Sequence, residues 1–358
     1  MLEKSVKVNT FNGQKLYVGL DVHVNSWTVS VYSEEFELKT FSQDPDVGQL
    51  ANWLRQQYPQ ADIEVAYEAS FSGFVIQRSL EAMGIKCRVI HPVDVPASDK
   101  ERKRKTDRID SRRLAKGLKN GVLNGIYVPS ISQQADRELL RTRARLVEDT
   151  IMVKNRIKSF LKFNGISLPE QWRRNVWSKA MISWLRDLPI IPYSSKASLQ
   201  VLIAELQFLI EQQQAVLRQI QQLADTAAYA GQVSLLESIP SVGLITAMTL
   251  LTELGNIDRF KSLDRLCSYC GLSPNSYSSG DHDRVTGISR RGNATIKHMI
   301  IECAWMAIRK DPALLLYYKS QRGKMNGNKA IIKITRKLLA RIRAVLRKQQ
   351  VYVSGVVA

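Results

Sequence analysis

The sequence predicts a multidomain protein in which an α/β domain with a mixed sheet is followed by a largely α-helical remainder. Short β-branched and apolar runs alternate with helical patterns as far as residue 92, which is typical of α/β domains. Two long helical patterns follow, and the last third reads as helices joined by short loops. A chain of 358 residues is long enough for two or three domains. We expect them at 1–132, 133–230 and 231–358.

The elements of the predicted α/β domain follow one another in a regular order. The segment KLYVGLDVHVNSWTVSVY contains two strands rich in β-branched and aromatic residues, separated by a turn at Asn25 and Ser26. A helix is expected at 50–58, a strand at 63–70, a helix at 71–85 and a strand at 87–92. The strand IEVAYEAS is apolar enough to lie in the middle of a sheet with both faces buried.

The segment from Lys100 to Lys119 concentrates positive charge. It holds ten basic residues and three acids, and it gains helical character after Thr106, a suitable N-cap residue. Cations at this density are typical of contacts with the phosphates of a nucleic acid. The residues expected to make such contacts are Lys103, Arg104, Lys105, Arg112 and Arg113.

Two long helices are expected in the middle of the chain, at 133–163 and 198–223. In the second helix, apolar residues recur at alternating spacings of three and four, with Gln213 as the one polar position. This pattern is the a/d seam of a coiled coil. The partner of the seam is either the preceding helix or the same helix of another subunit, and we favour a role in assembly.

The C-terminal helical segment carries positive charge without compensation. No acid follows Asp311, whereas the stretch from Lys319 to Lys348 supplies eleven basic residues. The pattern KAIIKITRKLLARIRAVLRK has one apolar and one cationic face, as in a helix that lies along phosphates. A helix at a membrane surface is the alternative.

The charge of the whole chain indicates an anionic partner. Lys and Arg number 52 against 33 Asp and Glu, a formal net charge of +19, which favours DNA, RNA or both. A merely basic protein is the alternative. Four cysteines do not suggest a disulfide framework, and no apolar run is long enough to span a membrane. We therefore expect a cytoplasmic, nucleoid-associated bacterial protein with no membrane partner.

Four acids lie at positions where a carboxylate is costly unless a cation or another partner compensates it. Asp21 lies among apolar residues of the first strand, and Glu68 ends the strand IEVAYEAS at its polar end. Asp107 and Asp110 lie three residues apart on one face of a helix. Oxygen ligands in this number suit Mg²⁺ or Mn²⁺, and a pair of such ions is the usual clamp for displacement at phosphorus. Pairing with arginines is the alternative for Asp107 and Asp110.

The stretch LLESIPSVGLITAMTLLTELG predicts a helix–hairpin–helix, with its turn at 240–243 and its second helix beginning at Leu244. The backbone N–H groups of such a turn can bind a phosphate, so Gly243 is a candidate contact. The usual turn has glycine where Ser241 stands. A helical hairpin that only packs in the core is the alternative.

The stretch SPNSYSSGDHDRVTGISRRGN is expected to form a polar surface loop between two apolar helices. Within it, Ser279 directly precedes Gly280. A serine there can attack a phosphodiester whose charge is neutralised by neighbouring cations. These cations are Arg284, Arg290 and Arg291. A C-x-x-C pair just before the loop is a weak zinc signal that also fits buried cysteines.

Together these motifs resemble two signatures of the DEDD-type bacterial insertion-sequence transposases, the family of the Piv invertase and the bridge-RNA-guided recombinases. The first signature comprises YVGLDVH, VAYEAS and KTDRIDSRRLAK, which carry the four acids. The second comprises IPSVGLITAMTLLTELGNIDRF and YCGLSPNSYSSGDHDRVTGISRRGNATIKHMIIECAW. The two signatures stand in the family's order and span most of the chain.

The resemblance implies a fold and a chemistry. It implies an N-terminal RuvC-like domain of RNase H fold, in which Asp21, Glu68, Asp107 and Asp110 bind divalent metal. It also implies a C-terminal transposase domain in which Ser279 attacks DNA to form a phosphoserine link. Ser276 and Ser278 are the neighbouring alternatives for this nucleophile.

The implied partners are donor DNA, target DNA, a bridge RNA and further copies of the chain. Dimers or tetramers are expected, with the acids of one subunit completing the serine site of another. Two other functions are compatible with the residues. One is a metal-dependent nuclease, such as a junction resolvase, that uses water and forms no covalent intermediate. The other is a nucleic-acid-binding protein without catalytic activity.

Overall fold

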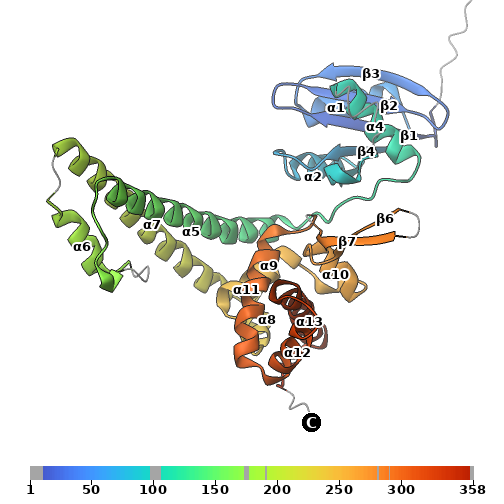
Figure 1. Ribbon diagram of the computed structural model, residues 1–358. Helices are drawn as coiled ribbons and strands as arrows, with labels where there is room; N and C mark the ends of the chain where they lie inside the picture. The colour runs from blue at the N-terminus through green and yellow to red at the C-terminus, as the bar shows by residue number, and fades with distance from the viewer. Residues whose placement is uncertain are drawn as a thin grey trace, which may run out of the picture. The chain divides into compact units, whose positions relative to one another are not determined.

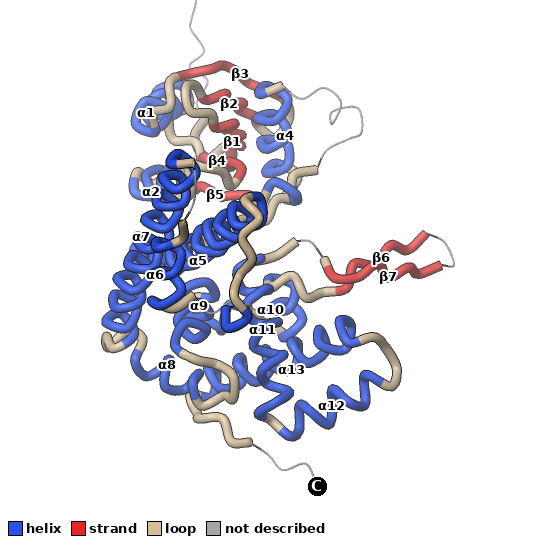
Figure 2. Tube along the Cα trace, turned by 60° about the vertical axis from the view of Figure 1, so that its left-hand side comes forward, coloured by secondary structure: helices blue, strands red, loops and turns tan. Residues whose placement is uncertain are grey.

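The computed structural model describes residues 11–96, 106–172, 177–189, 192–279, 282–289 and 291–354. The chain divides into two units, residues 1–128 and 129–358. Figure 1 shows the elements of each unit, and Figure 2 shows that the first unit combines strands and helices, whereas the second is mainly helical.

A five-stranded mixed sheet forms the centre of the first unit. Across the sheet the strands are β3 (Glu37–Gln43), β2 (Trp27–Tyr32), β1 (Lys15–Val22), β4 (Asp62–Glu68) and β5 (Lys86–Ile90). The first three pair antiparallel, whereas β1, β4 and β5 pair parallel. The predicted mixed sheet is confirmed, and its topology is consistent with a RuvC-like domain. Strand β3 was not predicted. Its residues that pack against the core, Leu38 and Phe41, are three positions apart, so the sequence lacks the period of two that indicates a strand.

Helices cover both faces of this sheet. Leu16, Val18 and Leu20 of β1 pack with α1 (Val47–Gln57) and α2 (Val75–Ala82). The intervening residues of β1 face the other way, since successive side chains of a strand alternate. That second face is covered by α4 (Asp107–Lys119). A short 3₁₀ helix, η1 (Pro92–Asp94), follows β5.

Helix α4 approaches β1 at Gly19. A β-carbon at this position would lie 1.9 Å from the carbonyl oxygen of Ser111 and 2.5 Å from the nitrogen of Ala115. The Ser111 hydroxyl also hydrogen-bonds to Ser30 of β2 at 2.8 Å, and both residues are buried. As predicted, Thr106 caps the helix, since its hydroxyl accepts from the N–H of Ile109. The first turn of α4 is thereby fixed over the end of β1.

The second unit begins with a long helical hairpin. Helices α5 (Ile131–Phe163) and α7 (Tyr193–Ala224) lie side by side (Figure 1), with η2 (Glu170–Trp172) and α6 (Lys179–Asp187) between them in the sequence. The first half of the predicted seam of α7 packs against α5 and α6 of the same chain, and its later residues Val216, Ile220 and Leu223 pack in the core formed with the C-terminal helices. Its polar position, Gln213, donates to the carbonyl of Leu146 at 2.9 Å and to the hydroxyl of Thr150. The preceding helix is therefore one partner of the seam.

The remaining helices surround one core. They are α8 (Ala230–Glu237), α9 (Leu244–Leu254), η3 (Ile257–Arg259), α10 (Leu263–Tyr269), α11 (Ala294–Lys310), α12 (Pro312–Arg322) and α13 (Gly327–Lys348). Between α10 and α11 stand the strands β6 (Pro274–Ser279) and β7 (His282–Ile288). The apolar face of α13 is buried in this core through Ile334, Leu338 and Ile342, so that face is not free to lie on a membrane. In the described part of the chain, no helix has both the length and the hydropathy to cross a membrane.

Candidate metal centre and serine hairpin

Asp21 lies near the carboxyl end of β1, in the first unit. Its side chain is 20% exposed, and its Oδ2 is buried without a well-aligned hydrogen bond. Burial raises the pKa of Asp21, as do the carboxylates of Asp107 and Asp110, whereas His23 lowers it. A bound cation would satisfy the buried oxygen and offset the repulsion between the carboxylates. The surroundings of Asp21 therefore fit a cation.

His23 links two of the predicted acids. Its Nε2 lies 3.3 Å from Oδ2 of Asp21 and 3.4 Å from Oδ1 of Asp107. One donor atom from each of these three side chains lies within 4.8 Å of the others, close enough to share one ion. Among the described residues, this is the one such group of His, Cys, Asp and Glu side chains. His23 is not among the predicted site residues, although the D-x-H spacing puts both side chains on one face of an extended chain.

Asp110 has a different environment from Asp107. It is buried, and its Oδ1 accepts a hydrogen bond from Arg113 at 2.8 Å. This pair matches the arginine-pairing alternative, yet Asp110 still lies near enough to Asp21 to raise the pKa of that carboxyl. Asp110 is therefore placed both to neutralise Arg113 and to contribute negative charge beside Asp21.

Glu68 ends β4, the strand adjacent to β1. The two strands are parallel, and Leu20 pairs with Tyr67, so Asp21 and Glu68 are the next residues on neighbouring strands. Adjacent strands are about 4.8 Å apart, and side chains at matching positions point to the same face. The fold thus brings all four predicted acids to one end of the sheet.

The predicted phosphate-binding arginines of α4 are engaged within the first unit. Arg112 donates to Oε1 of Glu37 through Nε at 3.0 Å and Nη2 at 2.8 Å. Arg113 donates to Asp110 and, through Nε, to the carbonyl of Pro96 at 3.0 Å. Both guanidinium groups thus help to hold α4 in place. Lys103, Arg104 and Lys105 lie outside the described residues.

In the second unit, the predicted turn of the helix–hairpin–helix joins α8 to α9. Ser241 adopts a φ of +82°, in the left-handed region that glycine favours, and its hydroxyl is buried without a partner. Gly243 is the N-cap of α9, and no side chain caps this helix. The N–H groups of the first turn therefore have no side-chain acceptor at the cap position.

The segment predicted as a loop contains a β-hairpin. Strands β6 and β7 are antiparallel, and Ser279, the last residue of β6, pairs with His282. Two residues, Gly280 and Asp281, separate the strands in the sequence. A Gly-Asp dipeptide between two extended runs is a known hairpin signal, but here the polar strands lack the apolar alternation that usually accompanies it. Ser276 and Ser278 also lie on β6.

The arginines that follow Ser279 are described to different extents. The backbone of Arg284 lies in β7, opposite Tyr277, and its side chain lies outside the described part of the structure, as does all of Arg290. The backbone N–H of Arg291 donates to the hydroxyl of Ser289 at 3.0 Å. The hairpin and Arg291 thus belong to one continuous segment of the second unit.

The cationic face of α13 borders a cavity of about 300 Å³. Lys333, Arg336 and Lys337 line it together with Tyr317 of α12, whose ring centre lies 5.4 Å from Nζ of Lys337. Cations beside an aromatic ring are a common surface for nucleic acids. The position of α13 thus leaves Lys333 and Lys337 exposed while its apolar face is in the core, and Arg336 forms an ion pair with Asp264.

Comparison with known proteins identifies the family. The IS110 DEDD model, described as a transposase, matches residues 18–164, and the model described as the transposase IS116/IS110/IS902 family matches residues 233–319. The chain belongs to the IS110 family of DEDD transposases. The first matched region contains the four acids, and the second contains the turn at Ser241 and the serine hairpin. The family predicted from the motifs is confirmed.

Three proteins illustrate how far the similarity to this transposase extends. The y4rJ protein of Sinorhizobium fredii is 28% identical over 90% of this chain and 90% of its own length. The transposase for insertion sequence element IS1111A of Coxiella burnetii is 26% identical over 78% of this chain and 76% of its own. The pilin gene-inverting protein of Moraxella bovis is 31% identical over 33% of this chain and 38% of its own. Transposition and DNA recombination are thus the family's functions.

Proposed function

We propose that this transposase cuts and rejoins DNA through a phosphoserine intermediate, assisted by divalent metal and guided by a bridge RNA. The observation that carries the proposal is the gathering of carboxylates beside the buried Oδ2 of Asp21, which has no well-aligned hydrogen bond. A group of acids without a cation would destabilise the first unit, because each carboxylate raises the cost of ionising the next. Such a cluster fits a metal site.

The metal would be held by Asp21, Glu68, Asp107 and Asp110. When bound, Mg²⁺ or Mn²⁺ supplies positive charge that stabilises the charge developing on a phosphate oxygen. Carboxylate oxygens suit these ions better than imidazole does. We therefore assign His23 to orienting the carboxylates of Asp21 and Asp107 through its Nε2, at 3.3 and 3.4 Å.

The nucleophile is Ser279. Its Oγ attacks the phosphorus of a phosphodiester, an Oγ–P bond forms as one P–O bond of the DNA breaks, and the released sugar hydroxyl takes up a proton. One phosphate ester replaces another, so the energy of the broken bond is retained and a sugar hydroxyl can reverse the step on a second DNA end. Arg284, Arg290 and Arg291 would neutralise the phosphate during attack.

Donor DNA, target DNA and the bridge RNA are the proposed partners. The net charge of +19 supports a large polyanionic partner, and the cavity beside Tyr317 and Lys337 offers a surface for phosphates and an unpaired base. We also propose that dimers or tetramers bring the acids of one subunit to the serine of another. The separate placement of acids and serine in two units is compatible with such an arrangement.

A gel assay for a covalent protein–DNA complex tests the proposal. Purified protein, Mg²⁺, candidate RNA and end-labelled DNA are combined, with Ser279→Ala, Asp21→Ala and the control Ser276→Ala beside the wild type. We expect a protease-sensitive adduct with the wild type and Ser276→Ala, and none with the other two variants. Cleavage without an adduct, still present in Ser279→Ala, would instead show a nuclease that uses water.

A further inference from the structure

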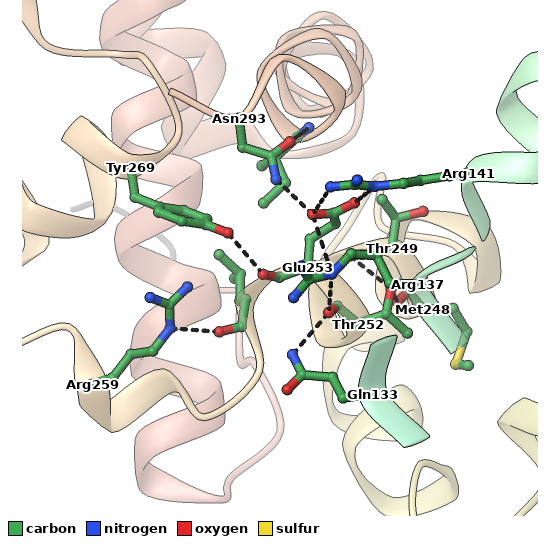
Figure 3. Close-up of polar contacts among 12 residues, drawn as sticks. Gln133, Arg137, Arg141, Met248, Thr249, Thr252, Glu253, Arg259, Tyr269 and Asn293 are labelled. Carbon is green, nitrogen blue, oxygen red and sulfur yellow. Dashed lines mark hydrogen bonds and ion pairs between the residues drawn. The ribbon is translucent and has the colours of Figure 1, made fainter. Parts of the chain in front are cut away.

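Glu253 is a buried charged residue near the end of α9 (Figure 3). It is 1% exposed, and a buried carboxylate is costly unless partners compensate it. Arg141 of α5 donates to Oε1 through Nε at 2.6 Å and to Oε2 through Nη2 at 3.0 Å. Nε of Arg137, one turn earlier, lies 3.6 Å from Oε2. Two cations of α5 thus hold one carboxylate of α9.

The same carboxylate is bound from the serine segment. The Asn293 side chain donates through Nδ2 to Oε2 of Glu253 at 2.7 Å. Its Oδ1 accepts from the N–H of Ile296 at 3.0 Å and so caps α11. The backbone N–H of Asn293 donates to the carbonyl of Tyr269 at 2.7 Å, and the Tyr269 hydroxyl donates to the carbonyl of Glu253 at 3.0 Å. The segments that enter and leave the hairpin are therefore both hydrogen-bonded to Glu253, the first through Tyr269 and the second through Asn293.

The base of the hairpin is closed tightly next to this network. Gly292 packs on Gly271, since a β-carbon at position 292 would lie 2.4 Å from the nitrogen of Gly271. The N–H of Ser289 donates to the carbonyl of Ser273 at 2.8 Å. These contacts hold residues 269–273 beside Ser289 and residues 291–293, at the base of the β6–β7 hairpin. They explain, without any contact to DNA, why glycine and asparagine stand next to each other at positions 292 and 293.

We propose that Glu253 is a positioning residue of the transposase, which fixes the direction of the serine hairpin by holding its base, through Asn293, to helix α5. This inference rests on the proposed role of Ser279 as nucleophile. A carboxylate is required because it alone accepts from Arg141 twice and from Asn293 at the same time, whereas a glutamine would present one N–H₂ group to these donors. Displacement of a reacting group by about 1 Å can lower a rate about 100-fold, so loosening the base is expected to affect the chemistry.

Variants at the two ends of the link separate positioning from folding. Asn293→Ser retains an N-cap for α11 and leaves the Glu253–Arg141 pair intact, but it removes the amide that reaches Glu253. Glu253→Gln removes the charge. Glu253→Gln combined with Asn293→Asp reverses the donor and acceptor, because the glutamine amide donates to the aspartate, which still caps α11. A matched control is Glu205→Gln, which removes the exposed ion pair of Glu205 with Arg156.

Two measurements are made on the full chain: hydrogen exchange of the backbone amides of β6 and β7, and the single-turnover rate of adduct formation with saturating DNA. We expect Asn293→Ser and Glu253→Gln to exchange faster in the hairpin and to form adduct up to about 100-fold more slowly. The double variant is expected to recover most of both losses, and Glu205→Gln to behave as the wild type.

Unchanged hairpin exchange in Asn293→Ser, or a double variant no better than Glu253→Gln, would overturn the positioning role. A wild-type protein that forms no adduct at all would refute the proposed serine chemistry instead. The exchange measurement would then still decide whether Glu253 holds the hairpin, so the two failures can be told apart.

Discussion

Gly19 lies directly against Ser111, whose carbonyl oxygen would be 1.9 Å from a β-carbon at position 19. This contact sets the distance between β1 and α4, and hence the distance between Asp21 and the acids of α4. Even the smallest side chain would force the helix away from the strand. The metal centre therefore depends on a glycine that carries no chemistry.

Gly19→Ala is expected to destabilise the first unit by about 3 kcal/mol, the upper part of the usual range for overpacking, because backbone rather than side-chain atoms must move. Native-state hydrogen exchange of the β1 amides measures the change. The control is Gly231→Ala in α8, where a β-carbon meets nothing within 4 Å. If exchange in β1 is equally slow in Gly19→Ala and wild type, α4 does not pack on β1 as described.

Asp21→Asn is expected to have opposite effects with and without metal. Without metal it removes a partly buried negative charge from beside Asp107 and Asp110, so the melting temperature should rise. With Mn²⁺ at about 100 times its dissociation constant, the wild type should gain about 2.7 kcal/mol, and the variant little. Thermal unfolding with and without Mn²⁺ measures both, with Asp62→Asn as an exposed control. Equal stabilisation of wild type and Asp21→Asn by Mn²⁺ would rule out a metal at Asp21.

Ser241→Gly is expected to stabilise the second unit by about 1 kcal/mol. The substitution relieves a left-handed backbone and removes a buried hydroxyl without a partner, which together outweigh the added freedom of glycine in the unfolded chain. Ser241→Ala removes the hydroxyl and keeps the strain, so the difference between the two variants isolates the backbone contribution. Thermal unfolding is the measurement. A loss of stability in Ser241→Gly would contradict the observed turn.

Asp311 should make the second unit sensitive to acid. Burial raises the pKa of this carboxyl, but the N–H of Leu314, the hydroxyl of Tyr352 and Arg341 together outweigh burial and lower it. Because the pKa is lower in the folded state, the stabilisation is complete above the unfolded value of about 4 and is lost as the pH falls through the folded value.

Asp311→Asn retains the cap of α12 and loses the ion pair with Arg341, which measures 2.5 Å. We expect it to cost about 2 kcal/mol at pH 7, as for hydrogen bonds to charged groups, and less as the pH falls below 4. Urea unfolding from pH 3 to 7 tests this. A difference between variant and wild type that does not change with pH would show that Asp311 does not titrate as described.

Local pattern predicted much of the fold. The cap at Thr106 could be predicted because its hydroxyl bonds to a residue only three positions away in the same helix. The mixed sheet could be predicted from the short apolar runs that form its strands. Strand β3 and the serine hairpin were not predicted, because neither segment has apolar residues at every second position: β3 has Leu38 and Phe41, and β6 is rich in serine. Their pairing depends on neighbours distant in sequence.

The site was predicted as residue types rather than as a network. Asp21 and Glu68 are conspicuous because acids in apolar strands are unusual. His23 and Glu253 are not conspicuous: His23 lies just after a strand, between Val22 and Val24, and Glu253 lies in a helix-forming run. Each gains its role from partners such as Asp107 and Asn293. The ion pair of Arg112 with Glu37 could not be foreseen, because Glu37 comes from a strand that was itself not predicted.

The most direct test of the account is to identify the residue that carries DNA in the covalent adduct. The adduct formed with Mg²⁺ is digested with protease and nuclease, and the nucleotide-bearing peptide is sequenced by mass spectrometry. We predict that the nucleotide is attached to Ser279, on the peptide that contains β6. Attachment to Ser276 or Ser278 would show that this serine, rather than Ser279, is the nucleophile. DNA cleavage with no modified serine would contradict the central claim.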